Sequence, residues 1–241
     1  MNTLEEAAPL HGISLGFSGA VPERKYWTTA TQDRDILEFV SVLSGLVLKY
    51  GGKIVHGAHP TFTPVVLRQA ELQGRAGGAP GVTIVMSELW AKHQSAFERE
   101  RFQRESRFLL VPQVGAGEAT DPEVRNASLT ALRHVLVTEM NMLVAVGGMR
   151  HLGSGFAPGV AEEIDLARRR GLACFIVGGF GGEAASAAEK FKLDPRSLRN
   201  GLTDEQNAAL LESTDVSACV GLIFDHLVRS GARLAAQAGA K

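Results

Sequence analysis

The stretch from Met142 to Gly182 constrains the fold of this chain more than any other. An apolar run at Met142–Val146 is long enough for a buried strand and stops at two glycines. A glycine-rich loop follows, and then a segment at Val160–Ala167 whose apolar residues recur at helical spacing. Three arginines and Gly171 mark the end of that helix, and Ala173–Val177 is a second short apolar run. The order strand, glycine loop, helix, strand is typical of a parallel sheet.

The same alternation of short apolar runs and helical patterns fills the rest of the chain. We therefore predict an α/β fold, a Rossmann-like doubly wound parallel sheet with helices on both faces. Residues 1–241 are expected to form one domain in which residues 1–10 are a loose tail. The further predicted strands are Ile13–Phe17, Lys53–His56, Val82–Met86 and Phe108–Val114, and the further predicted helices are Asp33–Tyr50, Val65–Gln73, Pro122–Glu139 and Asp215–Ala235.

Three segments have weaker patterns. The strand Phe108–Val114 contains Pro112, which places it near an edge of the sheet or near a strand end. Ser87–Arg107 carries dense charge and is expected to be a variable surface loop or an amphipathic helix. Ala184–Asn200 has no apolar stripe, so a flexible lid or an oligomer contact is expected there.

Composition limits the partners. The formal net charge is −1 and the pI is about 6.7, so no global basic field favours nucleic acid, and a small molecule fits better. No apolar run is long enough to span a membrane, and the acidic start is unlike a signal peptide. The two cysteines, Cys174 and Cys219, lie in apolar segments and favour a reducing, cytoplasmic setting. The apolar stripe from Val216 to Val228 predicts that the last helix closes the sheet or pairs with another copy in a homo-oligomer.

The loop of the central stretch is a candidate phosphate site. Backbone N–H groups at a helix N-terminus, on a loop without bulky side chains, form a cradle for an anion. The same glycines also suit a tight turn that binds nothing, and this alternative stays open. Glu162 and Glu163 follow in the first helical turn, where one acid can point at a ribose hydroxyl or a leaving base. The residues of this loop that we predict to contact a ligand are Gly147, Gly148, Gly153, Ser154, Gly155, Gly159, Val160 and Glu162.

Two further loops follow predicted strands, and both are candidates for the same ligand. Ser18 and Gly19 follow the first strand, where small residues either contact a nucleotide or only turn the chain. Gly57, His59 and Thr61 follow the second strand, and Thr61 either caps the next helix or donates to a phosphate.

Neither loop predicts a metal site. His56 and His59 have no acid or cysteine at ligand spacing, so no metal and no cofactor are expected. The cluster Arg24–Trp27 offers cations and rings to a nucleotide, or is a solvated loop with one anchoring tryptophan.

The central motif resembles a known family. Gly147-Gly148 followed by Gly159–Glu163 resembles the Pro-Gly-Gly-x-Gly-Thr-x-x-Glu signature of the lonely-guy phosphoribohydrolases, within the SLOG superfamily of Rossmann-like nucleotide-binding domains. Here Val146 and Val160 stand where the signature has proline and threonine, and Met149–Pro158 splits it. This insertion is more similar to the SLOG domains of TRPM channels, TIR proteins and bacterial conflict systems, which are thought to sense nucleotide ligands.

The resemblance implies roles for particular residues. In the lonely-guy family the last glutamate of the motif works with an arginine on the preceding helix. By position Glu163 takes the glutamate role, while Arg133 and Arg125 are the candidate arginines. Because these arginines are eight residues apart, a helix places them close to one face.

Three functional hypotheses follow. The chain binds or senses a phosphorylated nucleoside or an ADP-ribose-like or NAD-like nucleotide at its glycine-rich loops. Alternatively it hydrolyses the N-glycosidic bond of a nucleotide, with Glu163 assisting departure of the base and Arg125 or Arg133 holding phosphate. In the third, the glycines serve turns only.

Overall fold

The computed structural model describes residues 8–74, 79–149, 159–191 and 195–239, with side chains through residue 231. Within these ranges six parallel strands form one sheet in the order β4-β3-β2-β1-β5-β6. The Rossmann-like α/β fold predicted from the sequence is confirmed. The strands are β1 (Ser14–Ala20), β2 (Lys53–His56), β3 (Val82–Ser87), β4 (Arg107–Val111), β5 (Met142–Gly147) and β6 (Ala173–Val177).

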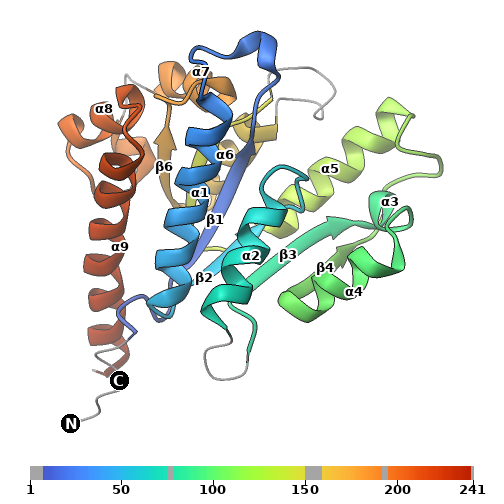
Figure 1. Cartoon of the computed structure of the whole chain (residues 1–241), viewed down its shortest axis with the longest axis horizontal. Helices are drawn as coiled ribbons and strands as arrows, with labels where there is room; N and C mark the ends of the chain where they lie inside the picture. The colour runs from blue at the N-terminus through green and yellow to red at the C-terminus, as the bar shows by residue number, and fades with distance from the viewer. Residues whose placement is uncertain (1–7, 75–78, 150–158, 192–194, 240–241) are drawn as a thin grey trace.

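Helices lie against both faces of the sheet (Figure 1). One core joins the sheet to α1, α2 and α9, and the other joins it to α5, α6 and α7. Both cores are built from buried apolar side chains, which makes them the main source of stability. The helices are α1 (Gln32–Lys49), α2 (Thr63–Gln73), α3 (Glu88–Ala91), α4 (Ala96–Glu105), α5 (Pro122–Leu136), α6 (Gly159–Arg169), α7 (Gly182–Phe191), α8 (Asp204–Glu212) and α9 (Val216–Gly239), with 3-10 turns η1 (Arg24–Tyr26) and η4 (Pro195–Leu198).

The chain reverses its direction across the sheet after β4. Strands β1 to β4 run outward in sequence order, and β5 then returns to pair with the other side of β1. In open parallel sheets the loops on either side of such a reversal diverge and leave a crevice beyond the carboxyl ends of the strands. This fold therefore opens its crevice between β1 and β5, beside the loop that follows β2.

Two strands end three residues away from their predicted last residue. β1 continues through Ser18, Gly19 and Ala20, which we expected to break the strand, because these small residues pair with β5 up to Gly147. β4 stops at Val111, since Pro112 has no N–H for the ladder, and it is an edge strand as predicted.

Helix α7 corrects the prediction for Ala184–Asn200. Ala184, Ala187 and Ala188 are buried against the sheet, and Asn200 is buried and donates to the carbonyl oxygen of Cys174 at 2.9 Å. A flexible lid is therefore wrong for the described part of this segment, while an oligomer contact stays a prediction. The pattern was missed because the buried stripe is made of alanine, which carries little hydrophobic signal.

Leu10 packs more firmly than expected, and the last helix closes the fold, which is one of its two predicted roles. Leu10, assigned to the loose tail, is fully buried, and its N–H donates to the carbonyl oxygen of Tyr50 at 3.0 Å. The apolar stripe of α9 packs against α1 through Cys219, Ile223 and Leu227. The stripe closes the fold within one chain, so it no longer argues for a homo-oligomer, which stays a prediction. Among the described residues, no helix combines the length and the apolar character needed to cross a bilayer.

Candidate functional site

A cavity of about 300 Å³ lies at the carboxyl ends of β1, β2, β3 and β5. It occupies the crevice that the reversal between β1 and β5 creates, where ligands of open α/β sheets bind. Its lining comes from strand ends, from the loop after β2 and from helices α3, α5 and α6. The lining residues are Phe17, Gly19, Ala20, His56, Gly57, Ala58, His59, Pro60, Met86, Trp90, Leu129, Leu132, Arg133, Gly148, Met149, Gly159, Val160 and Glu163.

Glycines let the ends of β1 and β5 approach each other closely. A Cβ on Gly19 would lie 1.9 Å from the carbonyl oxygen of Val146, and one on Gly147 would lie 2.4 Å from that of Ala20. Gly148 has φ of 98°, and its N–H donates to Ala20 at 2.7 Å. These glycines are required by backbone contact alone, so for Gly19 and Gly147 the turn interpretation is sufficient.

A buried arginine faces the two acids of α6. Arg133 is 5% exposed, and its Nη1 donates to Glu162 in a short ion pair. Its Nε lies 3.6 Å from Oε1 of Glu163. Thr130, one turn earlier on α5, donates to the other oxygen of Glu162 at 2.6 Å. Glu162 is thus tied to α5 by two side chains, while Glu163 lines the cavity.

Glu163 is the carboxyl group presented to the cavity. Burial raises the pKa of this carboxyl, and Arg133 and the hydroxyl of Ser18 partly oppose that rise. Ser18 is 1% exposed and comes from β1, directly beneath the start of α6. A carboxyl with a raised pKa holds its proton to higher pH, which suits a group that donates a proton.

A second polar cluster comes from the loop after β2. His56 Nδ1 lies 3.2 Å from the carbonyl oxygen of Phe17, and its Nε2 accepts from the N–H of His59 at 3.2 Å. Burial lowers the pKa of His56, and burial together with the neighbouring His56 lowers the pKa of His59 to about 4. Ala58, between them, has φ of 57°, a strained value for a residue with a side chain. The hydrogen bonds of His56, His59 and Thr61 hold the loop in this conformation.

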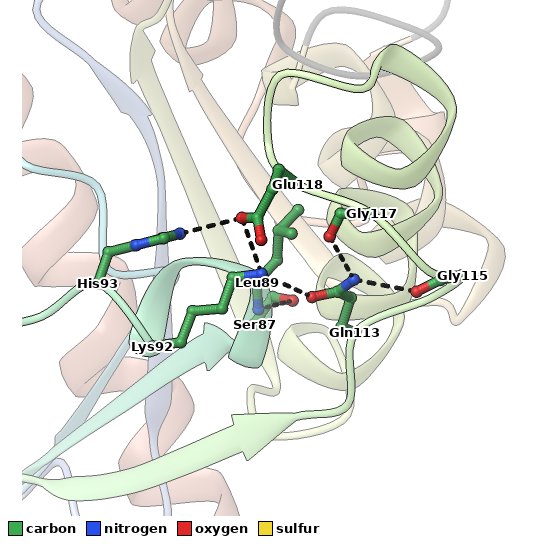
Figure 2. A network of polar contacts seen from close by, with 8 residues as sticks. All are labelled: Ser87, Leu89, Lys92, His93, Gln113, Gly115, Gly117 and Glu118. Carbon is green, nitrogen blue, oxygen red and sulfur yellow. Dashed lines mark hydrogen bonds and ion pairs between the residues drawn. The ribbon is translucent and has the colours of Figure 1, made fainter.

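The remaining wall is apolar, and part of it comes from α3. Ser87 caps α3, where its hydroxyl accepts from the N–H of Leu89, and Lys92 and His93 both contact Glu118 beyond β4 (Figure 2). This network fixes the short helix that carries Trp90 into the cavity lining. Trp90 and Met86 contribute an indole ring and a thioether to the cavity wall, which are surfaces suited to a flat apolar group.

The structure brings many of the predicted site residues together. Gly19, Gly57, His59, Gly148, Gly159, Val160, Arg133 and Glu163 all line the cavity. Ser18 and Glu162 lie immediately behind Glu163 and Arg133. Gly153, Ser154 and Gly155 lie outside the described residues.

Other predicted residues are placed elsewhere. Arg125 lies near the start of α5, where its Nη1 is 3.5 Å from the carbonyl oxygen of Ala119, and it does not line the cavity. Thr61 does not cap α2, whose first turn contains Pro64; its hydroxyl contacts His59 and Val21 instead. The cluster Arg24–Trp27 does not line the cavity either, and the Trp27 indole N–H donates to Pro22 within its own loop, so the anchored-loop alternative holds.

Sequence reasoning missed the apolar wall. This wall contains the last residues of two predicted strands, Phe17 and Met86. It also contains Leu129 and Leu132 of a predicted helix, and Trp90 of the charged segment Ser87–Arg107. Trp90 follows the end of a predicted strand within four residues, and this was the available signal, because residues just after parallel strands collect at one edge of the sheet. Within the described ranges no group of three or more His, Cys, Asp or Glu side chains is placed to hold a metal.

Comparison with known proteins gives a family and similarities to solved structures. The family model described as SLOG cluster2 matches residues 34–218. The X-ray structure of TM1055, a target of the Northeast Structural Genomics Consortium, is similar over 88% of this chain and 98% of its own, at 16% identity and a TM-score of 0.48. No curated protein matches the sequence.

Proposed function

Because this chain belongs to the SLOG cluster2 family, we propose that it binds a phosphorylated nucleoside, or an ADP-ribose-like or NAD-like nucleotide, in the cavity beyond β1, β2 and β5. Two observations on the cavity support a nucleotide. The side at the start of α6 carries the buried cation of Arg133, and the side of β3 carries Met86 and Trp90. A ligand with an anionic group at one end and a flat apolar group at the other matches this division.

The observation that carries the proposal is the position of Arg133 at the start of α6. A Cβ added to Gly159 would lie only 2.6 Å from Nη2 of Arg133, so the guanidinium lies against the first residue of the helix. A helix N-terminus carries partial positive charge, and a guanidinium placed there adds a full one. Glu162 and Glu163 offset this charge in the free protein. A phosphate can take over part of that balance when it binds.

The two ends of the cavity define how the ligand lies. Gly148, Gly159 and Arg133 form the phosphate end, beside β5 and α6. Glu163 lies next to them and faces the ribose, and Trp90 on the β3 side faces the base. The cavity volume is at the small end of the range for ligand pockets, about 300–1,000 Å³, which favours one nucleoside monophosphate over a dinucleotide.

A thermal-shift screen tests the proposal. Nucleoside monophosphates, NAD, ADP-ribose and inorganic phosphate are added to the purified chain, and a ligand that binds the folded state raises the unfolding midpoint. We expect a nucleotide to raise the unfolding midpoint more than phosphate alone. Arg133→Lys should reduce this rise, because lysine keeps the positive charge but lacks the paired N–H donors of the guanidinium. Arg107→Lys, at an exposed ion pair remote from the cavity, is the matched control. A panel in which no nucleotide raises the midpoint contradicts the proposal.

A second function, hydrolysis of the N-glycosidic bond, is favoured by one specific observation. Glu163 lines the cavity with a raised pKa while Glu162 takes the short bond to Arg133. Protonated Glu163 donates its proton to the base nitrogen as the C1′–N bond breaks and its electrons go to the base. Water then adds its oxygen to C1′ and returns a proton to the carboxylate. Chromatography of nucleotide mixtures for free base separates this enzyme from a binding protein.

A further inference from the structure

His59 presents one ring nitrogen to the cavity and has the other held by its own loop. Its Nδ1 lies 2.9 Å from the hydroxyl of Thr61 and 3.3 Å from the N–H of Thr61. The same hydroxyl accepts from the backbone N–H of Val21 at 3.3 Å. No partner for Nε2 of His59 is found in the part of the chain that the structure describes. Because His59 lines the cavity, Nε2 is the ring atom left for a ligand.

The surrounding donors fix the tautomer of His59. The Thr61 backbone N–H can only donate, so Nδ1 must accept. The Thr61 hydroxyl accepts from Val21, and its proton is then directed at the same nitrogen. With Nδ1 unprotonated, the neutral ring carries its proton on Nε2.

His56 strengthens this arrangement from the other side. Its Nδ1 faces the carbonyl oxygen of Phe17 and must donate, which leaves its Nε2 to accept from the backbone N–H of His59. The backbone of His59 is therefore held by one histidine and its ring by Thr61. The pKa of His59, lowered to about 4 by burial and by His56, keeps the ring neutral at pH 7. The cavity thus contains a neutral hydrogen-bond donor in a fixed direction.

We infer that His59 is a specificity-determining residue that donates its Nε2–H to a ring nitrogen of a purine base. The inference rests on the proposed function and adds the base to it. His59 follows β2, which lies between β1 and β3, so the donor stands between the phosphate end and the wall formed by Met86 and Trp90. A base lying along that wall meets His59 with its edge. A neutral donor selects an edge that carries an acceptor and disfavours one that carries an N–H or NH₂ group.

Thr61 is a positioning residue in this account, because it touches His59 and does not line the cavity. Removal of its hydroxyl takes away the shorter of the two contacts to Nδ1 and leaves the backbone N–H of residue 61, so the tautomer is kept and the ring is held less firmly. The pair His59 and Thr61 therefore gives two variants that weaken recognition by different means. His59→Phe keeps a flat ring without a donor, and Thr61→Val keeps the donor without its fixed direction.

Nitrogen-15 NMR of the ligand-free protein tests the donor directly. At pH 7 we expect the His59 ring to show a protonated Nε2 and an unprotonated Nδ1, and the His56 ring to show the opposite tautomer. In Thr61→Val the backbone N–H of residue 61 still requires Nδ1 to accept, so the His59 ring should keep a protonated Nε2. A protonated Nδ1 on His59 in the wild type overturns the inference whatever ligand binds.

Adenosine 5′-monophosphate and its 1-deaza, 3-deaza and 7-deaza analogues test recognition of the base. Each analogue replaces one acceptor nitrogen with C–H. For the wild type we expect one analogue to bind roughly tenfold more weakly than the parent, because a donor facing C–H is left without a partner. For His59→Phe the four ligands should bind equally, and for Thr61→Val the discrimination should shrink.

The outcomes separate this inference from the proposed function. If the wild type binds all four ligands equally, nucleotide binding stands and the role of His59 is wrong. If neither adenosine 5′-monophosphate nor any analogue binds, the inference fails, and the nucleotide proposal fails with it only if no other nucleotide raises the unfolding midpoint. If discrimination survives unchanged in His59→Phe, another residue reads the base and the inference is again overturned.

Discussion

The guanidinium of Arg133 lies against Gly159, where an added Cβ would approach Nη2 to 2.6 Å. This contact brings the only charged group that α5 places in the cavity lining, among the described residues, to the first turn of α6. The close contact is with the end of a side chain and not with backbone, so a Cβ at residue 159 would require the guanidinium of Arg133 to move. The glycine and the arginine therefore act as one feature of the site.

We expect Gly159→Ala to displace Arg133 and to weaken nucleotide binding at least several-fold, since the guanidinium must move from its ion pairs. The free energy of unfolding should change little. Alanine favours a helix by up to about 1 kcal/mol over glycine, and this gain offsets the weakened ion pairs of Arg133. Gly221→Ala is the matched control: it lies in α9 with nothing within 4 Å of the added Cβ, and it should stabilise without changing affinity. Calorimetry on both variants is the measurement. Equal affinity of Gly159→Ala and the wild type counts against the contact.

We expect the ion pair between Arg133 and Glu162 to matter for stability mainly because each buried charge neutralises the other. Arg133→Met leaves Glu162 and Glu163 without their cation and should lower the free energy of unfolding by about 3 kcal/mol. Arg133→Met combined with Glu162→Gln should recover part of that loss. Arg107→Met, at an exposed pair with Glu139, should cost less than about 1 kcal/mol. Denaturant titration decides, and a double variant no better than Arg133→Met contradicts compensation.

The fold was predictable because its signals are local. Met142–Val146 and Ala173–Val177 are short apolar runs bounded by glycine, and the structure places β5 and β6 within one residue of those bounds. Helix α7 was missed because Ala184, Ala187 and Ala188 bury a stripe too small to register as hydrophobic. Leu10 was missed because one apolar residue in a polar tail gives no period, although it is fully buried.

The polar half of the site was also predictable, and the apolar half was not. Glu163 and Arg133 were found through motif position, and Gly148 through a strand that stops at glycine. Trp90 stands in a densely charged segment, and only the order of strands in the sheet brings it beside His59. Contacts between residues far apart in the sequence, such as that of Trp90 with the cavity, depend on the order of the strands in the sheet. Local sequence patterns do not reveal that order.

The stability of the protein should fall as the pH falls from about 6.5 to about 4, in part through His59. Folding lowers the pKa of His59 from 6.5 to about 4. Between these values the imidazole is protonated in the unfolded chain and neutral in the folded chain, so a fall in pH favours the unfolded chain. His59→Gln should lose less stability over this interval than the wild type. The raised pKa of Glu163 acts with the opposite sign, so the comparison between the two proteins is the informative quantity. Exposed His11→Gln is the control. The free energy of unfolding is measured by denaturant titration at each pH, and an equal change with pH in His59→Gln and the wild type refutes the prediction.

Trp90→Ala should reduce nucleotide affinity by about 1–3 kcal/mol, the usual loss when a stacking ring is removed from under a base. Phe97→Ala removes an aromatic side chain that is 72% exposed on the neighbouring helix α4, and it should leave affinity unchanged. Inorganic phosphate should bind both variants as it binds the wild type. A loss of phosphate binding in Trp90→Ala would show that the wall supports the phosphate end and not the base.

Glu163→Gln separates a binding protein from an N-glycosidase, because the amide keeps the shape of the side chain and cannot return a proton to a leaving base. If the wild type releases base from a nucleotide, this variant should slow release by roughly two or more decades while affinity stays nearly constant. If the wild type releases none, the variant should change affinity alone, by about 1–3 kcal/mol through the ribose contact. The amide also removes a carboxyl whose burial raises its pKa, so the variant should unfold no more easily than the wild type near pH 7. Exposed Glu38→Gln controls for charge. Base release that persists in Glu163→Gln at the wild-type rate would exclude this carboxyl as the proton donor and move the search to another group in the cavity.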